Sequence, residues 1–310
     1  MAAVVTEGLL SQPRWLPAWL FYDAAGSRLF DQITDLPEYY LTRTERAILT
    51  SCGDEMIAAA ARNDALHIVE LGAGSCDKTR ILLRAAVERQ DTLLYEPVDV
   101  SATALAEAEE RIQAEIPGVL VCPRVEDYTH QFTLDPPLHG HRRMVLYIGS
   151  SIGNFEPADA ASVLRNVRSA LTSGDSLLLG IDLVKDEGTL LDAYDDGAGV
   201  TAEFNRNILV RLNREFGANF DLDAFVHRAV WNASQSRIEM HLESRILQTV
   251  RIPSLDLNLC FQPGETIHTE NSYKYQPGQA EALLKSTGFE SEHLWTDDRG
   301  WFAVHLARAV

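Results

Sequence analysis

Between residues 67 and 184, short apolar segments alternate with segments of helical periodicity, and this alternation restricts the possible folds more than any other feature of the chain. The apolar segments have the length of buried strands, and the segments between them are long enough for crossover helices. Such an order predicts a doubly wound α/β fold with a parallel sheet. The expected strands are 67–72, 92–99, 119–125, 143–148 and 176–184, and the expected helices between them are 78–88, 102–115 and 157–171.

The alternation stops after residue 184. Residues 188–217 have mostly helical patterning, and 226–252 contain strand-like segments. A helix at 277–286 and a closing hairpin of 290–296 and 301–307 then fit a sheet whose last strand is antiparallel. We therefore expect a sheet domain formed by 62–184 and 276–310, and a second, substrate-binding lobe formed by the helical segment 1–61 with 185–275.

The charge balance excludes one class of partner. The 310 residues include 27 Lys and Arg and 45 Asp and Glu, which gives a formal net charge of -18. So acidic a surface repels phosphate backbones, and we expect no nucleic-acid partner.

The cellular setting follows from what the chain lacks. No segment approaches the roughly 18 apolar residues of a membrane span, and the N-terminus has no secretory pattern, so we expect a cytoplasmic protein without membrane contact. The four cysteines form no zinc-type spacing, which predicts reduced, mostly buried thiols. His139 and His141 flank Gly140, and we interpret them as part of a solvated loop rather than a metal site.

A glycine-rich turn follows the first expected strand, in the segment 69–79 that contains Glu70, Gly72, Gly74, Ser75 and Asp77. Asp77 stands where a dinucleotide-binding turn has its third glycine, and the lysine–serine pair of a P-loop is missing. An acid followed by two spaced glycines is typical of S-adenosylmethionine sites. The alternative is an ordinary tight turn between strand and helix.

Polar residues also follow the next three strands. Asp99 could accept hydrogen bonds from both ribose hydroxyls, or it could cap the following helix, as could Ser101. Asp127 and Tyr128 could contact an adenine amino group and ring, or Asp127 could be an ordinary surface acid. Asn154, in the glycine-rich loop 149–155, offers amide donors and an acceptor, or else a helix cap.

Two further features lie in the second lobe. Aromatic residues gather at 21–22, 30 and 39–40, where core packing is the simpler interpretation. In 267–275, alternation places two sets of side chains on opposite faces of a strand, so that an inward-facing pair of Glu and Ser could bind a polar heterocycle. The alternative is an ion pair between Glu270 and Lys274 or another base. The two sets are Thr269, Asn271 and Tyr273 on one face and Glu270, Ser272 and Lys274 on the other.

Taken together, these segments resemble the L-histidine Nα-methyltransferases of ergothioneine biosynthesis, over about residues 15–308. The resemblance implies a Rossmann-like class I methyltransferase sheet with an antiparallel last strand. It also implies S-adenosylmethionine-dependent trimethylation of the histidine α-amine to hercynine. The matching segments are 21–31, 36–45, 70–74, 149–154, 193–196 and 269–272, with departures at Leu41, Tyr128, Asn271 and Tyr273.

The resemblance also implies roles for individual residues. Tyr39, Asn154 and Tyr194 would act at the α-amino and carboxylate groups, and Tyr39 could relay a proton through water. Glu270 and Ser272 would hold the imidazole. The implied histidine contacts are Tyr22, Tyr39, Gly149, Asn154, Tyr194, Met240, Glu270 and Ser272, and the implied S-adenosylmethionine contacts are Gly72, Lys78, Asp99, Asp127 and Tyr128.

Methyl transfer from a sulfonium is an in-line displacement that requires alignment and a neutral amine, so no metal is expected. The expected partners are L-histidine and its mono- and dimethyl intermediates, and the expected state is a monomer. Two alternatives remain open at this point. One is Nα-methylation of tryptophan or of a histidine derivative such as a mercaptohistidine, and the other is a small-molecule-binding protein without catalysis.

Overall fold

The computed structural model describes residues 1–74, 76–130, 132–135 and 140–310, and the chain forms two compact units. Unit 2, here the sheet unit, comprises Leu41–Val184 and Tyr275–Val310. Unit 1, here the insert unit, comprises Met1–Tyr40 and Lys185–Lys274. Ser75 of the glycine turn and His139 lie outside the described residues, whereas His141 begins a strand instead of lying in a loop.

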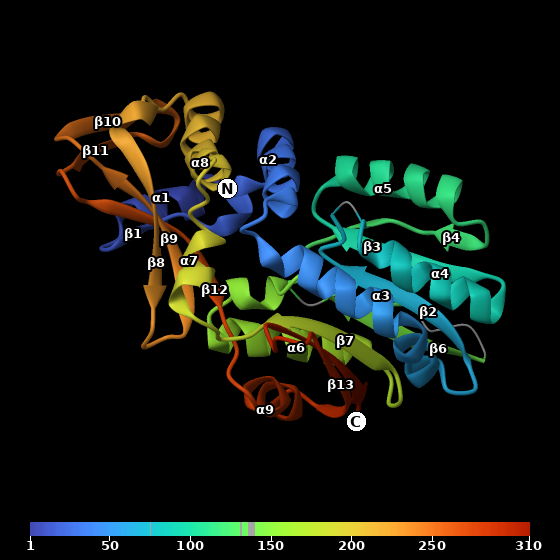
Figure 1. Cartoon of the computed structure of the whole chain (residues 1–310). Helices are drawn as coiled ribbons and strands as arrows, with labels where there is room; N and C mark the ends of the chain where they lie inside the picture. Colours follow the sequence, from blue (N-terminus) through green and yellow to red (C-terminus); the bar gives the residue numbers. More distant parts are fainter. Residues whose placement is uncertain (75, 131, 136–139) are drawn as a thin grey trace. The chain divides into compact units, whose positions relative to one another are not determined.

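The sheet unit contains an eight-stranded sheet in the order β13-β14-β7-β6-β2-β3-β4, with β5 paired to β3 (Figure 1). The strands from β7 to β4 pair in parallel, and β14 is antiparallel to both β7 and β13. This order confirms the predicted Rossmann-like sheet with an antiparallel final strand. Its strands are β2 (Ala65–Leu71), β3 (Leu93–Asp99), β4 (Val119–Val121), β5 (Arg124–Val125), β6 (His141–Tyr147), β7 (Ser176–Asp182), β13 (Phe289–Thr296) and β14 (Phe302–Ala309).

Helices cover both faces of this sheet, and the side chains of successive strand residues alternate between two cores. Met144 and Leu146 of β6 pack in the core with α3, α4 and α5, whereas Val145 and Tyr147 pack in the core with α6 and α9 (Figure 1). The helices and the short 3-10 helix η2 are α3 (Tyr40–Ala61), α4 (Thr79–Gln90), α5 (Ala102–Glu115), η2 (Ser151–Asn154), α6 (Pro157–Ala170) and α9 (Gln279–Ser286).

The boundary between the units differs from the expected one at the N-terminal side. Residues 41–61 belong to the sheet unit, although the sequence grouped them with the N-terminal helices. Leu49, Met56 and Ile57 of α3 are buried in the same core as Leu66 and Leu82. The apolar face of α3 therefore packs with the sheet unit, which helical periodicity alone could not show.

The third expected strand is interrupted. β4 ends at Val121 and β5 begins at Arg124, so the strand predicted at 119–125 is two short pieces. Pro123 lies between them and has no backbone N–H to donate to a ladder. Pairing with β3 resumes at Arg124, which lies opposite Val98. The chain after β5 therefore begins beside the carboxyl end of β3.

The insert unit contains a four-stranded sheet in the order β1-β12-β9-β8 and a two-stranded ladder of β10 and β11. The helical segment expected at 188–217 is divided into α7 and α8, between which Gly199 adopts a left-handed conformation. The elements are α1 (Ala2–Leu10), β1 (Arg14–Trp15), η1 (Ala18–Phe21), α2 (Ala24–Asp35), α7 (Glu187–Asp192), α8 (Val200–Phe216), η3 (Leu222–Ala224), β8 (Phe225–Asn232), β9 (Arg237–Ser244), β10 (Gln248–Ile252), η4 (Pro253–Leu255), β11 (Leu257–Phe261) and β12 (Thr266–Tyr273).

All four cysteines are free thiols, but the expectation that most are buried is wrong. Cys76 is buried, Cys52 and Cys122 are partly buried, and Cys260 is exposed on β11. Among the described residues, no helix combines the length and apolar character needed to cross a membrane.

Candidate active site

Glu70, near the end of β2, is buried and hydrogen-bonded next to the glycine turn. This side chain is 2% exposed, and Thr79 Oγ1 donates to its Oε1 at 2.5 Å while the Tyr95 hydroxyl donates to Oε2. Burial raises the pKa of Glu70 to about 7, against the lowering effect of these bonds. Gly72 and Gly74 have φ values of 68° and 51°, a region that disfavours side chains. The turn therefore has no side chains of its own at these two positions after β2.

Asp99, the last residue of β3, is bonded to this turn. Its Oδ2 accepts from the Gly74 N–H at 3.1 Å and its Oδ1 accepts from the Ser101 N–H at 2.9 Å. The N-cap of α5 is Ser101, whose Oγ accepts from the Ala104 N–H, and not Asp99. A carboxylate oxygen can accept a second hydrogen bond, so both oxygens of Asp99 keep capacity for a ligand hydroxyl.

Asp127 and Tyr128 follow β5 and have different surroundings. Asp127 Oδ1 accepts from the backbone N–H of Thr129 at 3.0 Å and from its hydroxyl at 2.6 Å, so part of this acid closes a local turn. The Tyr128 ring packs edge-on against Tyr147 with 5.6 Å between ring centroids. A Cβ on Gly72 would lie 3.2 Å from Tyr128 Oη. The structure thus brings Gly72, Asp99 and Tyr128 to one edge of the sheet.

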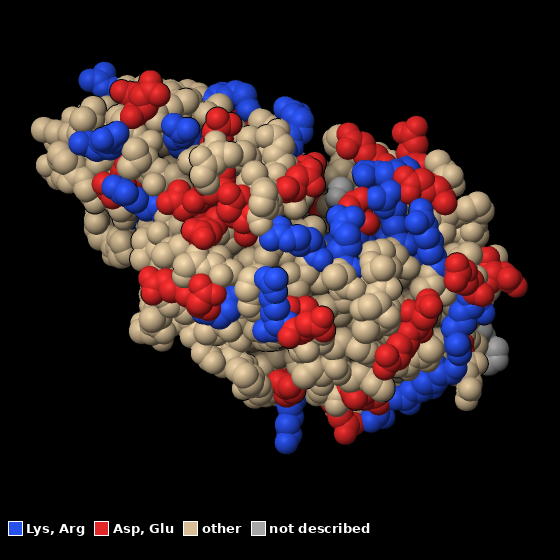
Figure 2. Space-filling model, in the orientation of Figure 1, with Lys and Arg blue, Asp and Glu red and all other residues tan. Residues whose placement is uncertain are grey.

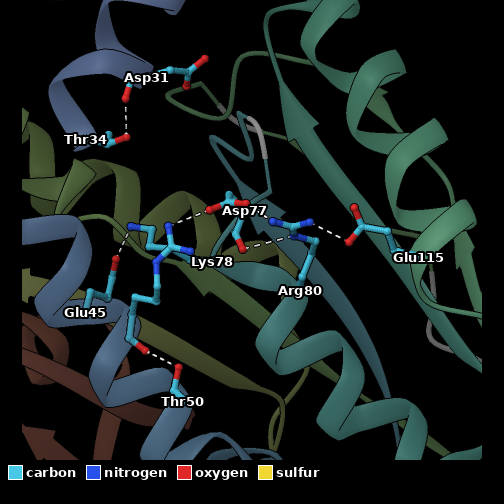
Figure 3. A network of polar contacts seen from close by, with 9 residues as sticks. Asp31, Thr34, Glu45, Thr50, Asp77, Lys78, Arg80 and Glu115 are labelled. Carbon is cyan, nitrogen blue, oxygen red and sulfur yellow. Dashed lines mark hydrogen bonds and ion pairs between the residues drawn. The ribbon is translucent and has the colours of Figure 1, made fainter.

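Lys78 and Gly149 both contact Glu45, a residue that sequence reasoning missed. The Glu45 side chain is completely buried, and Lys78 Nζ pairs with its Oε2 (Figure 3). The Gly149 N–H donates to Glu45 Oε1 at 2.8 Å. A Cβ on Gly180 of β7 would lie 2.2 Å from Glu45 Oε1. Gly180 in an otherwise bulky strand was the available signal, because a strand glycine indicates close approach by another group.

Asp77 occupies the position of the missing third glycine and forms ion pairs on both sides. Arg46 Nη2 lies 2.7 Å from Asp77 Oδ2, Arg80 pairs with Oδ1, and Arg80 Nη1 continues to Glu115 Oε2 at 2.6 Å (Figure 3). These arginines lower the pKa of Asp77, against the effect of burial. Figure 2 shows basic and acidic side chains interleaved over this part of the sheet unit. Asp77 therefore has a structural role at the rim of the turn.

Asn154 ends the short helix η2, which follows β6. The N-cap of α6 is Glu156, so the alternative of Asn154 as the cap of that helix is wrong. Ser150, just before η2, has a left-handed φ of 57°, and its Oγ accepts from the Asp182 N–H at 2.9 Å. The loop after β6 is thereby tied to the end of β7.

In the insert unit, Tyr194 and Ser272 are bonded to each other. Tyr194 Oη lies 2.7 Å from Ser272 Oγ, although 77 residues lie between them in the sequence. Lys274 Nζ donates to both oxygens, at 2.9 Å to Tyr194 and 2.8 Å to Ser272. Lys274 is 1% exposed and is a second site residue that sequence reasoning did not select.

Glu270 shares the face of Ser272. In the β12–β9 ladder, Glu270 pairs with Met240 and Ser272 with Ile238, while Asn271 pairs with Glu239. The alternation expected for residues 270–273 is therefore confirmed. Burial raises the pKa of Glu270 to about 7, and the charge of Lys274 lowers it.

Thr269 departs from that alternation, because the β12–β9 register shifts between His268 and Glu270. Thr269 is the extra residue of a β-bulge, and its hydroxyl donates to Asn205 Oδ1 at 2.7 Å. The expectation that Thr269 alternates with Glu270 in the same way as Asn271 is wrong for this reason. The bulge also places His268, paired with His241, on the face opposite Glu270.

The aromatic residues of the N-terminal segment form a continuous set of contacts in the insert unit. Tyr22 contacts Phe30 at 5.7 Å between ring centroids, Phe30 contacts Tyr39 at 6.3 Å, and Tyr39 contacts Tyr194 at 6.2 Å. Tyr39 is buried, whereas Tyr22 is 41% exposed. Phe21 stacks on Phe204 as core, so the core interpretation holds for some of these aromatics and not for Tyr22.

One group among the described residues has the composition of a metal site, formed by Glu239, His241 and His268 on the outer face of the four-stranded sheet. Glu239 Oε1 is already bonded to Arg237 Nε at 2.8 Å and to Asn232 Nδ2 at 2.8 Å. These bonds lower the pKa of Glu239 to about 2, against burial. Glu239 is thus paired with its own cation, Arg237, and the group lies on the face opposite Glu270.

The sequence matches the family model "Histidine-specific methyltransferase, SAM-dependent" over residues 1–309. It is 48% identical to histidine N-alpha-methyltransferase of Mycolicibacterium smegmatis and 45% identical to that of Mycobacterium tuberculosis, over 98% of this chain and 93% of each relative. It is 29% identical to ergothioneine biosynthesis protein 1 of Schizosaccharomyces pombe, over 89% of this chain and 36% of that protein. The chain therefore belongs to the family of histidine-specific, S-adenosylmethionine-dependent methyltransferases.

Proposed function

We propose that this protein transfers three methyl groups in succession from S-adenosylmethionine to the α-amine of L-histidine, forming hercynine in ergothioneine biosynthesis. The observation that carries the substrate assignment is the polar set on one face of β12. Glu270 and Ser272 lie on that face, and Ser272 is bonded to Tyr194. An imidazole offers a donor and an acceptor to such a pair, whereas an apolar ring would leave both groups unpaired.

The sheet unit supplies the groups suited to the methyl donor. Asp99 retains acceptor capacity toward two ribose hydroxyls, and Gly72 lies beside the Tyr128 hydroxyl at the same edge of the sheet. In this proposal Asp127 and Tyr128 contact the adenine, and Lys78 lies at the methionine part. Bound S-adenosylmethionine supplies an electrophilic methyl group on a sulfonium, so the protein's task is alignment and desolvation.

The amine must be neutral before each transfer, because an ammonium nitrogen has no lone pair. In this proposal Asn154, Gly149, Tyr194 and Tyr39 hold the α-amino and carboxylate groups. Tyr39 relays the released proton through water. The faces of Tyr39 and Tyr22 can also stabilise the quaternary nitrogen of the product by cation–π attraction.

The direct test is incubation of the purified protein with S-adenosylmethionine and histidine, followed by mass analysis. We expect histidine to gain three methyl groups in steps. Tryptophan and a mercaptohistidine are tested as alternative substrates in parallel reactions. A preference for either competitor would reassign the substrate. Failure of all three amino acids to gain a methyl group would leave a binding protein without catalysis.

Removing the Asp99 carboxylate should weaken the binding of S-adenosylmethionine. Loss of charge-assisted hydrogen bonds to the ribose costs roughly 1.5–3 kcal/mol, or about 10- to 100-fold in affinity. Asp99→Ala tests this by calorimetry, and Asp64→Ala is the control, because Asp64 is an acid of the same unit that pairs with Arg142 at 2.5 Å outside the proposed site. Unchanged affinity in Asp99→Ala would remove Asp99 from the ribose site.

Activity should fall as the pH drops through about 7, because two groups become protonated and each protonation lowers the rate. The Glu270 carboxyl, whose pKa is raised to about 7, becomes protonated below that pH and can no longer accept from the imidazole N–H. The α-amine, whose reference pKa is about 7.7–8.0 at a chain terminus and higher in a free amino acid, is also increasingly protonated as the pH falls. The kcat/KM profile for histidine checks this, and Glu270→Gln should retain only the amine component. A flat profile from about pH 6 to 9, with chemistry rate-limiting, would contradict the requirement for a neutral amine.

A further inference from the structure

The Lys274 ammonium is a charged group inside the insert unit that methyl transfer itself does not require. The residue is 1% exposed, at the end of β12 beyond Ser272. Burying an ammonium costs several kcal/mol unless its donors and its charge are satisfied. Its contacts include the Tyr194 and Ser272 hydroxyls, the Tyr194 ring at 4.6 Å from Nζ, and the nearby charge of Glu270.

These contacts restrict where the hydroxyl protons can point. A lysine ammonium only donates, so Lys274 uses one lone pair on each of the two oxygens. The 2.7 Å bond between Tyr194 and Ser272 then uses one of the two hydroxyl protons. The ammonium therefore sets how the Tyr194 and Ser272 hydroxyls are oriented.

This arrangement complements a neutral imidazole. The ring carries one N–H donor and one unprotonated nitrogen acceptor. Glu270, two residues before Ser272 on the same face, accepts from the donor, and the Ser272 hydroxyl can donate to the acceptor.

We propose that Lys274 is a positioning residue for the imidazole of the substrate: its ammonium fixes the Tyr194 and Ser272 hydroxyls beside Glu270 before histidine enters. The inference rests on the proposed histidine substrate and adds a residue to that site. Lys274 acts through the two hydroxyls and through the charge it places beside Glu270. A methionine would fill a similar volume without either effect.

The test is steady-state kinetics of Lys274→Met with histidine and S-adenosylmethionine varied separately. We expect KM for histidine to rise roughly 10- to 100-fold, the range for losing hydrogen bonds to a charged group. KM for S-adenosylmethionine and the thermal unfolding midpoint should stay near the parent values. A parallel rise in both KM values with a lowered unfolding midpoint would show a merely structural role and overturn the inference.

Lys185→Met is a matched control. Lys185 Nζ donates to Tyr40 Oη at 2.7 Å and lies 4.4 Å from that ring's centroid, so it forms the same kind of lysine–tyrosine contact in the same unit. We expect this variant to leave KM for histidine unchanged. Equal effects of the two substitutions would contradict a specific role for Lys274.

A double-mutant cycle with Tyr194→Phe tests whether Lys274 acts through the hydroxyl. The double variant should lose less than the product of the two single losses, because each change removes the same bond. Multiplying effects would overturn the inference. If Lys274→Met fails to fold, Lys274→Gln replaces it, because a glutamine keeps neutral N–H donors at that position. In that case, a parent-like KM for histidine in Tyr194→Phe would overturn the inference.

The outcomes separate this inference from the proposed function. A parent protein that adds no methyl group to histidine removes the proposed function. A parent protein that methylates histidine, with Lys274→Met showing the same KM, removes only the role of Lys274.

Discussion

Glu270→Ala should lose histidine turnover and at the same time improve, in relative terms, the turnover of an apolar amino acid. The carboxylate is partly enclosed, on the face of β12 that also carries Ser272, and it can accept from the imidazole N–H. Loss of such a bond should lower kcat/KM for histidine by roughly 1.5–3 kcal/mol of transition-state binding, or about 10- to 100-fold. For tryptophan, the variant no longer places a carboxylate against an apolar ring surface, so its penalty falls.

The measurement is kcat/KM for histidine and for tryptophan with the parent and with Glu270→Ala. Glu243→Ala is a matched control, because Glu243 is a strand acid of the same sheet on the outer face, paired with Arg228 at 3.0 Å. We expect the control to keep the parent's ratio of histidine to tryptophan. If Glu270→Ala also keeps that ratio, Glu270 does not determine selectivity, and its role is to balance the charge of Lys274.

Lys78→Met should destabilise the sheet unit strongly. The substitution leaves the completely buried Glu45 carboxylate without its cation, and the Gly149 N–H bonds of 2.8 and 3.0 Å cannot neutralise its charge. Breaking a buried ion pair by removing one partner costs about 3–5 kcal/mol. Chemical denaturation without ligand is the measurement, so that loss of a cofactor contact does not enter the result.

Two further variants separate the buried charge from the side chain that carries it. The double variant Lys78→Met with Glu45→Gln removes both charges and should be more stable than Lys78→Met alone. Arg84→Met breaks an exposed pair, with Arg84 Nη2 3.5 Å from Glu115 Oε2, and should cost at most about 1 kcal/mol. Similar losses in Lys78→Met and Arg84→Met would show that the Glu45 charge is not buried in solution.

The sheet and the polar residues at the carboxyl ends of its strands could be predicted from the sequence, because those features depend on local patterns. Buried strands and amphipathic helices have characteristic periodicities. In the acid-x-Gly-x-Gly turn, the glycines themselves indicate backbone conformations that other residues disfavour. The family motifs identified the same residues that the structure groups at the edge near Gly72 and on the inner face of β12. Which of them contact histidine or S-adenosylmethionine stays a prediction.

The tertiary structure alone decided the contacts between residues far apart in the chain. Glu45 reaches Lys78 and Gly149 only because α3 packs in the core of the sheet unit, and Tyr194 reaches Ser272 only when α7 and β12 are in place. The bulge at Thr269 depends on its pairing with β9, and no periodicity in β12 itself encodes it. The burial of Lys274 has the same origin: a lysine is exposed by default, and only surrounding partners that satisfy its charge allow the fold to enclose it.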